Sequence, residues 1–260
     1  MTYTKKRVII IAKTYPNLSQ KYEETVCVAG IDMETKEWVR MFPIAFRKLP
    51  RQKQFKKFDV IEIETEPYND KYTRIENYRV KDRSIKIIES QAIPDWKARK
   101  GVLLPKLINS VEELETSRDS SHITLGLIKP KEIINFYKKD IRECRDWEQD
   151  LINGTQKQLF GVYKSPLDKI PYWMGYNFLC NGATCDYHNM MCEDWELMAL
   201  FRNIKIQNKF DNETTFSKVR DKYFDWILQR DAYFILGTES RWNRFLIVSI
   251  FYPPKVSDNV

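Results

Sequence analysis

The chain has 260 residues, of which 43% are hydrophobic and 30% are charged. This balance is typical of a folded globular protein and excludes a disordered or collagen-like chain. With 43 lysines and arginines against 36 aspartates and glutamates, the formal charge is +7 and the pI is about 9.0, which favours polyanions as partners.

The apolar segments predict a protein without a membrane partner. The longest runs, such as Val8–Ala12 and Phe245–Ile250, have the length of a strand and are far too short to span a bilayer. The start of the chain, MTYTKKRVIIIAK, lacks the apolar length and the cleavage site of a secretory signal. Five cysteines, an odd number, argue against a disulfide framework. We therefore expect a cytoplasmic protein.

Residues 1–90 are expected to form a β-rich basic domain. Short segments that are rich in Val and Ile, or that alternate apolar and polar residues, predict strands. They lie at Arg7–Lys13, Glu24–Asp32, Trp38–Pro43, Asp59–Thr65 and Ser84–Ser90. Short strands joined by polar connections predict a small barrel or a curled sheet.

Residues 91–170 are expected to form a helical connector. Leu103–Glu115 places Leu104, Leu107, Val111 and Leu114 on one face of a helix. Lys131–Tyr137 follows Pro130 as a short helix would. No catalytic signature occurs in this charged segment.

Residues 171–260 are expected to form a C-terminal α+β module. The pattern predicts an aromatic strand at Pro171–Cys180 and helices at Glu193–Ile204 and Thr214–Leu228. Two hydrophobic strands, AYFIL and FLIVSIFY, follow and are joined by the charged loop GTESRWNR. The whole chain is therefore expected to be an α+β protein.

Four potential metal ligands lie within the run CNGATCDYHNMMC. They are Cys180, Cys185, His188 and Cys192. Thiolate and imidazole ligands suit Zn²⁺, which prefers four of them in a tetrahedron. The order Cys-Cys-His-Cys and the overall length resemble a zinc knuckle, although the internal spacings differ. Four protein ligands predict a structural zinc site, and Asp194 is an alternative ligand if Cys192 points away.

Two other interpretations of this run remain open. Cysteine is among the most frequently buried residues, so the thiols and His188 can simply belong to a core. A labile disulfide between Cys180 and Cys185 is the third alternative.

A run of cations from Arg47 to Lys57, RKLPRQKQFKK, contains no anion. Lysines and arginines interleaved with aromatic rings are typical of surfaces that bind single-stranded nucleic acid, because phosphates attract the cations and bases stack on the rings. The candidate contact residues are Arg47, Lys48, Arg51, Lys53, Phe55, Lys56 and Lys57. The alternative is a solvated loop whose phenylalanines reach the core.

Two further stretches add cations to this candidate interface. Lys71–Arg83 supplies Arg74 and Arg79, diluted by two acidic residues, and the C-terminal loop supplies Arg241, Trp242 and Arg244. Loops that join strands often carry function, but charged residues in them also serve solubility alone.

Acidic residues next to the cysteine cluster suggest a second hypothesis, a metal-dependent nuclease. Carboxylates can hold a divalent metal for phosphodiester cleavage, with a histidine as general base. The candidate catalytic residues are His188, Glu193, Asp194 and Glu196. Asp194 and Glu196 point about 200° apart on a helix, so both face one ion only if the backbone is extended there.

The sequence thus predicts a DNA- or RNA-binding protein with a structural zinc site. The nuclease is the principal alternative, and a module that binds a protein partner through exposed aromatic side chains is the third. Phosphate-binding glycine motifs and the G-x-S-x-G elbow are absent from the sequence.

Overall fold

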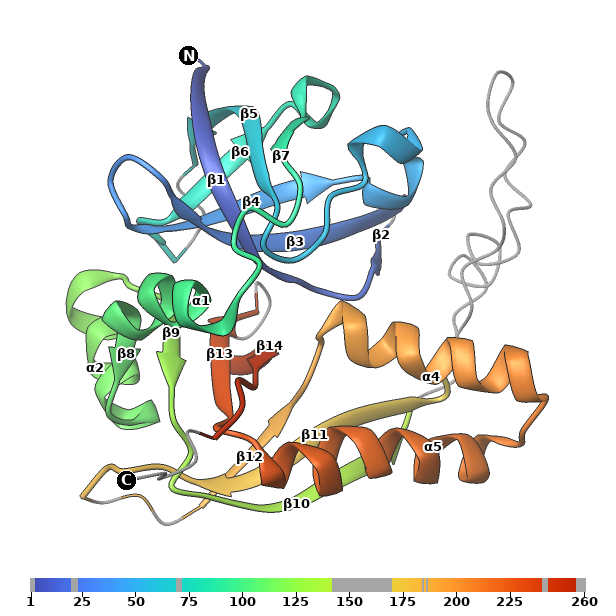
Figure 1. Ribbon diagram of the computed structural model, residues 1–260. Coiled ribbons are helices and arrows are strands. Elements are labelled where there is room, and N and C mark those ends of the chain that lie inside the picture. Colours follow the sequence, from blue (N-terminus) through green and yellow to red (C-terminus); the bar gives the residue numbers. More distant parts are fainter. Residues whose placement is uncertain are drawn as a thin grey trace.

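The protein is described by a computed structural model (Figure 1). The structure describes residues 3–19, 23–68, 72–141, 170–183, 185, 187–239 and 243–255. It is a mixed α+β protein that is rich in strands. Within these ranges no helix is both long enough and apolar enough to cross a bilayer.

The N-terminal part of the described chain is a closed five-stranded barrel in the order β1-β3-β4-β6-β5, with β5 pairing back to β1. This arrangement confirms the expected strand-rich N-terminal half and selects the barrel over an open curled sheet. The barrel strands are β1 (Thr4–Lys13), β3 (Glu23–Asp32), β4 (Trp38–Ile44), β5 (Val60–Pro67) and β6 (Asn77–Val80).

Shorter elements decorate the barrel. The strands β2 (Asn17–Ser19) and β7 (Lys86–Glu89) pair with β3 and β5 outside the ring. The predicted strand Ser84–Ser90 is therefore present as β7, whereas β6 came from a stretch that we had interpreted only as cationic. Single 3₁₀ turns are η1 (Phe46–Lys48), η2 (Arg51–Lys53) and η3 (Asp82–Ser84).

Strand β1 is apolar on both faces, and this explains its uninterrupted VIII run. Val8 and Ile10 point into the barrel core, whereas Ile9 and Ile11 belong to a second core that also contains Phe251 near the end of the chain. Because side chains alternate across a strand, a strand buried on both faces reads as continuous hydrophobic sequence. The second core attaches the barrel to the C-terminal part.

The C-terminal part contains two sheets in which most neighbouring strands are antiparallel. One has the order β10-β11-β12, and the other has the order β14-β13-β9-β8. Their strands are β8 (Leu107–Ile108), β9 (Leu125–Ile128), β10 (Glu132–Asp140), β11 (Tyr172–Leu179), β12 (His188–Met191), β13 (Tyr233–Thr238) and β14 (Phe245–Phe251).

Two helices lie along the three-stranded sheet, below the barrel in Figure 1. They are α4 (Trp195–Asn208) and α5 (Asn212–Arg220), and α5 continues through a π-helical segment, η5 (Asp221–Trp226), into the 3₁₀ turn η6 (Ile227–Gln229). Both helices were predicted. Asp194 caps the first by accepting a hydrogen bond from the backbone N–H of Glu196 at 2.7 Å.

The expected helical connector is only partly helical. It holds α1 (Trp96–Leu103), η4 (Leu104–Lys106) and α2 (Val111–Ser121), but the predicted helix Leu103–Glu115 is interrupted by strand β8. The predicted helix at Lys131–Tyr137 is wrong, because this segment is β10 and pairs with β11 from Glu132 to Asp140. Pairing with a distant strand outweighs the local pattern here. The expected connector, residues 91–170, therefore contributes strands to both C-terminal sheets: β8 and β9 to one and β10 to the other.

Candidate metal centre and basic cleft

Three of the four predicted metal ligands come together, and a glutamate joins them. Among the residues that the structure describes, Glu112, Cys180, Cys185 and His188 place one ligand atom each within 4.8 Å of one another and could hold a metal ion. Glu112 lies in the first turn of α2. Cys180 directly follows β11, Cys185 lies in the loop after it, and His188 begins β12.

His188 is central to this cluster. Its Nε2 lies 3.3 Å from Cys180 Sγ, 3.2 Å from Cys185 Sγ and 3.2 Å from Glu112 Oε1. In a tetrahedral zinc site with Zn–S near 2.3 Å and Zn–N near 2.0 Å, the S···N separation is about 3.5 Å. The observed separations are therefore close to those of a metal-ligand tetrahedron.

The second residue of the loop, Gly182, makes room for Glu112. A Cβ atom at Gly182 would lie 2.5 Å from Glu112 Oε2. The local sequence pattern did not reveal Glu112 as a ligand, because this residue lies 68 positions before Cys180. Acidic residues at a helix start are too common for Glu112 to stand out in the sequence.

Burial and hydrogen bonding determine the pKa values of the residues in this cluster. Burial raises the pKa of Cys180 to about 11, although backbone hydrogen bonds from Gly182 and Val111 oppose this shift. Burial would also raise the pKa of Glu112, but hydrogen bonds from its own backbone N–H, Cys180 and Ser110 lower it on balance. A dication would favour the thiolate form of Cys180, because a coordinating thiol is deprotonated.

Cys192 does not belong to the metal cluster, and this corrects the predicted ligand set. Its side chain is 1% exposed and lies in the main hydrophobic core, where burial raises its pKa well above the usual value. The prediction placed His188 and Cys192 at a helix start. The segment instead forms β12, in which four residues span about 13 Å, too far for one ion. The alternative in which Cys192 is a buried core residue and not a metal ligand therefore agrees with the structure.

The alternative oxygen ligand Asp194 is also engaged elsewhere. Its Oδ2 accepts hydrogen bonds from Ser249 Oγ at 2.7 Å and from Ile250 N at 3.1 Å. The nuclease set is likewise divided, because His188 lies in the metal cluster while Asp194 and Glu196 face the amine of Lys57. Glu193 bonds through its backbone to Tyr15 and Ile247.

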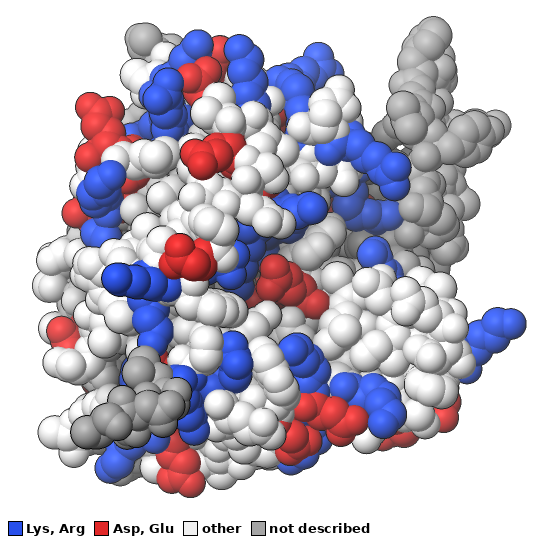
Figure 2. Space-filling view, viewed as in Figure 1, with Lys and Arg blue, Asp and Glu red and all other residues white. Residues whose placement is uncertain are grey.

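A cleft of about 540 Å³ lies between the barrel and α4. Figure 2 shows blue cationic side chains along the barrel side of this hollow and acidic side chains near its centre. The charged side chains of the lining are Lys13, Lys56, Lys57, Arg99, Asp194 and Glu196. Clefts at domain boundaries with a few convergent polar groups are common ligand sites.

The end of the predicted cationic run, Phe55–Lys57, lines this cleft as its basic rim, and the run as a whole is not uniformly exposed. Lys48, Arg51 and Lys56 are exposed, whereas Arg47 donates to Glu24 Oε2 at 2.8 Å and Lys53 donates to the carbonyl oxygen of Arg83. The ring of Phe55 is 1% exposed and belongs to the barrel core. The phenylalanine therefore has the structural role that we had kept as the alternative.

Lys57 reaches the bottom of the cleft. Its Nζ donates to Ser249 Oγ at 2.6 Å and to Ile250 O at 2.9 Å, and lies 3.8 Å from Asp194 Oδ2 and 3.7 Å from Glu196 Oε2. Burial by itself would lower the pKa of Lys57, but Glu196 and Asp194 raise it on balance. Both carboxylates reach one cation because Asp194 is the N-cap residue of α4 and has a non-helical backbone, with φ −58° and ψ 124°.

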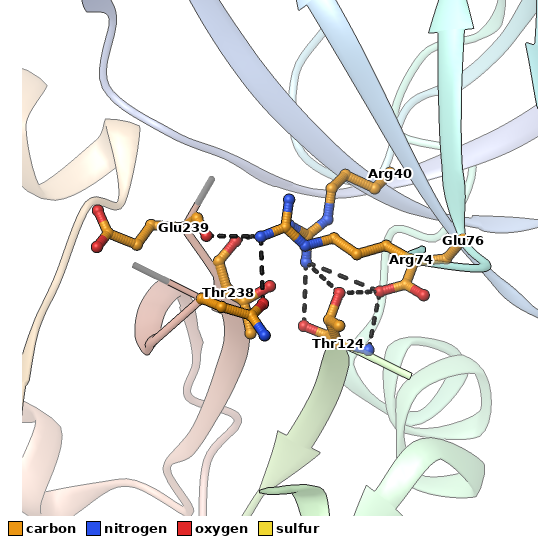
Figure 3. A network of polar contacts seen from close by, with 7 residues as sticks. Arg40, Arg74, Glu76, Thr124, Thr238 and Glu239 are labelled. Atoms are coloured by element: carbon orange, nitrogen blue, oxygen red, sulfur yellow. Dashed lines mark hydrogen bonds and ion pairs between the residues drawn. The ribbon is translucent and has the colours of Figure 1, made fainter. Parts of the chain in front are cut away.

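Arg74 is a structural residue, which corrects its assignment to the nucleic-acid interface. It is 2% exposed and donates to Glu239 O at 2.6 Å, next to a second buried arginine, Arg40 (Figure 3). Arg40 donates to Thr238 O at 2.7 Å and to Thr124 O at 3.0 Å. The two arginines thus attach the barrel to β13 and to the start of β9.

The remaining predicted contact residues are Arg79, Arg241, Trp242 and Arg244. Arg79 covers the ring of Tyr68, with its Cζ 4.0 Å from the ring centroid, and Arg244 is exposed. Arg241 and Trp242 lie outside the described residues.

The fold and the site thus describe a two-part α+β protein, with a barrel, a strand-rich C-terminal part and a candidate metal centre in the latter. The chain belongs to the family defined by a domain of unknown function, DUF8757, whose model matches residues 107–260. A second model, the domain of unknown function DUF8758, matches residues 4–105. No curated protein matches the chain.

The two family models separate the sheets of the structure. The residues matched by DUF8758 contain all strands of the barrel sheet, and those matched by DUF8757 contain both C-terminal sheets. The boundary near residue 106 follows α1, and the cleft takes side chains from both matched regions.

Proposed function

We propose that the protein binds nucleic acid at the basic rim and in the cleft between the barrel and α4. The observation that carries this proposal is that Lys13, Lys56, Lys57 and Arg99 all line one cleft. In the chain, Lys56 and Lys57 follow shortly after the cations of η1 and η2, of which Lys48 and Arg51 are exposed. Phosphates release counterions when they meet such cations, and this release supplies much of the binding free energy.

We propose Zn²⁺ as the ion of the metal cluster, with a structural role. Two thiolates, one imidazole and one carboxylate fill a tetrahedron, which leaves no open position for a substrate. The ion would join the first turn of α2 to the β11–β12 connection. This role follows from the ligand types, because borderline-soft Zn²⁺ accepts sulfur, nitrogen and oxygen ligands together.

The position of Lys57 supports binding over cleavage. Its amine lies between the carboxylates of Asp194 and Glu196, where a catalytic dication would have to sit. Among the described residues, the cluster around His188 is the group in which three or more candidate ligands converge, and neither carboxylate belongs to it. The nuclease is therefore not the function that this geometry favours.

Fluorescence anisotropy with labelled single-stranded DNA and RNA over a series of salt concentrations tests the proposal. We expect log K to fall linearly with log[salt], with a slope of about −0.7 for each neutralised phosphate. The double variant Arg51→Glu/Lys56→Glu should weaken binding about tenfold or more and reduce the slope by about 1 to 2.

A control with the same change in net charge is Lys131→Glu/Lys139→Glu, at two exposed lysines that do not line the cleft. An equal loss in this variant would indicate attraction by net charge alone and would contradict the proposed site. Salt-independent capture of a protein partner by both variants would favour the interaction module instead.

A further inference from the structure

The side chain of Lys13 lies in the cleft between aromatic rings. Lys13 ends β1, and its Nζ is 3.4 Å from the ring centroid of Phe46 and 4.4 Å from that of Trp195. Its hydrogen bond to Phe55 O is long, at 3.5 Å. The side chain is half-buried and lines the cleft, so its amine is enclosed by carbon yet faces the space where a ligand would bind.

This environment disfavours the ammonium form of Lys13. Burial lowers the pKa of Lys13 to about 7, and the carboxylates of Glu196, Asp194 and Asp59 offset only part of this shift. The other charged groups that line the cleft are Lys56, Lys57 and Arg99. The aromatic faces attract the ammonium form, but they cannot replace its full hydration.

Two lysines of the cleft therefore differ in chemistry. Lys57 donates to two oxygens and lies near two carboxylates, an arrangement that holds it as a cation. Lys13 has one long hydrogen bond and two close ring faces. A desolvated lysine amine next to another cationic group is the kind of nucleophile that condenses with carbonyl substrates.

We propose that the cleft binds an aldehyde carried by a phosphate ester, and that Lys13 Nζ condenses with its carbonyl carbon to form an imine. The phosphate would lie against Lys56 and Arg99, which share the lining with Lys13. The aldehyde can come from a nucleic-acid sugar that has lost its base or from a free sugar phosphate. The first source rests on the proposed function, and the second does not.

The condensation needs no oxidant or reductant. The lone pair of Nζ forms the N–C bond while the carbonyl π electrons move to oxygen, which takes up a proton. The nitrogen then loses a proton and the hydroxyl group takes up a second one. The C–O bond breaks and water leaves as the nitrogen lone pair forms the C=N bond of the protonated imine. Glu196, whose side chain is 44% exposed in the cleft, is placed to pass these protons between nitrogen, oxygen and solvent.

Borohydride trapping of the full-length protein tests the inference, because reduction converts an imine into a stable secondary amine that mass spectrometry can map. One probe is a single-stranded oligonucleotide with one abasic deoxyribose, and the other is glyceraldehyde 3-phosphate. We expect an adduct on Lys13 with at least one probe, at least tenfold less adduct in Lys13→Arg and Lys13→Met, and an unchanged yield in the matched control Lys139→Arg at an exposed lysine outside the cleft lining.

The pH profile separates a reactive Lys13 from ordinary surface lysines. Trapping at Lys13 should rise with a midpoint near pH 7, whereas lysines of ordinary pKa react only as the pH approaches 10.5. Absence of an adduct at Lys13 with both probes, or adducts spread over surface lysines and unchanged in Lys13→Arg, would overturn the inference. Circular dichroism of the variants verifies that they are folded.

The two arms also separate this inference from the proposed function. Trapping of glyceraldehyde 3-phosphate at Lys13 by a protein that does not bind intact oligonucleotides would support the inference and contradict nucleic-acid binding. Salt-dependent binding of intact oligonucleotides without trapping of either probe would support nucleic-acid binding and contradict the inference.

Discussion

The amine of Lys57 lies 3.8 Å from a carboxylate oxygen of Asp194, and both groups hydrogen-bond to Ser249 Oγ. Lys57 belongs to the region matched by one family model and Asp194 to the region matched by the other. This ion pair lies at the floor of the cleft, so the same contact joins the two parts of the protein and determines the charge that a ligand meets.

Removing the amine of Lys57 should destabilise the whole protein. Lys57→Met leaves the buried carboxylate of Asp194 without its cation, and breaking a buried pair in this way costs about 3–5 kcal/mol. The free energy of unfolding in urea measures the loss. The control is Lys56→Met at the adjacent exposed lysine, which should change stability by less than about 0.5 kcal/mol. Equal stabilities of the two variants would show that the pair contributes nothing.

Zinc content should depend on Glu112 and not on Cys192. We expect about one zinc per purified chain, much less in Cys185→Ala, and a weaker affinity in Glu112→Ala, which retains three ligands. Cys192→Ala should keep its zinc even though it loses core packing, because its thiol lies outside the cluster. Atomic emission spectroscopy provides the measurement. Loss of zinc in Cys192→Ala with full retention in Glu112→Ala would restore the ligand set expected from sequence.

Chelation should lower the melting temperature if zinc joins α2 to the β11–β12 connection. Binding of an ion to the folded protein alone stabilises it, so EDTA should lower the Tm of wild type and leave that of Cys185→Ala unchanged. Gly182→Ala should resemble a ligand variant, because the added Cβ would lie 2.5 Å from Glu112 Oε2. A Tm of the wild-type protein that EDTA does not change would argue against a structural metal.

Arg40 should matter for stability and not for ligand binding. Arg40→Met removes the donors to Thr238 O and Thr124 O and leaves Glu76, 3.8 Å away, without its buried cation, so a loss of about 3–5 kcal/mol is expected. Arg244→Ala at an exposed arginine is the comparison and should be nearly neutral in unfolding measurements. An unchanged free energy of unfolding in Arg40→Met would refute the role of the network in Figure 3.

Stability should depend on pH through Lys13. Its pKa is about 7 in the folded protein against an ordinary value of 10.5, so between these values the unfolded chain binds a proton that the folded chain lacks. The free energy of unfolding of wild type should therefore rise relative to Lys13→Met as the pH increases from 7 to 9, with no such rise below pH 7. Parallel urea titrations of both proteins across this range measure the difference, and curves that run parallel would contradict the lowered pKa.

Part of the barrel and of the metal cluster could be predicted from local pattern. Period-two alternation in Asp59–Thr65 and the Val/Ile-rich run of β1 mark strands, because a strand presents alternate side chains to its two sides. Cys180, Cys185 and His188 were recognisable as candidate metal ligands because residues a few positions apart in the chain remain close together in space. The error at Lys131–Tyr137 arose because pairing with β11, about forty residues away, outweighed local helical preference.

The amino-acid sequence by itself determined which chemical groups are present and which short segments become strands, since side-chain periodicity acts over a few residues. Only the tertiary structure decided that Glu112 replaces Cys192 in the cluster, that Arg74 is buried and that Lys13 lies between aromatic rings. These relationships join residues far apart in the chain. They depend on how sheets and helices pack, and packing is a property of many distant contacts together.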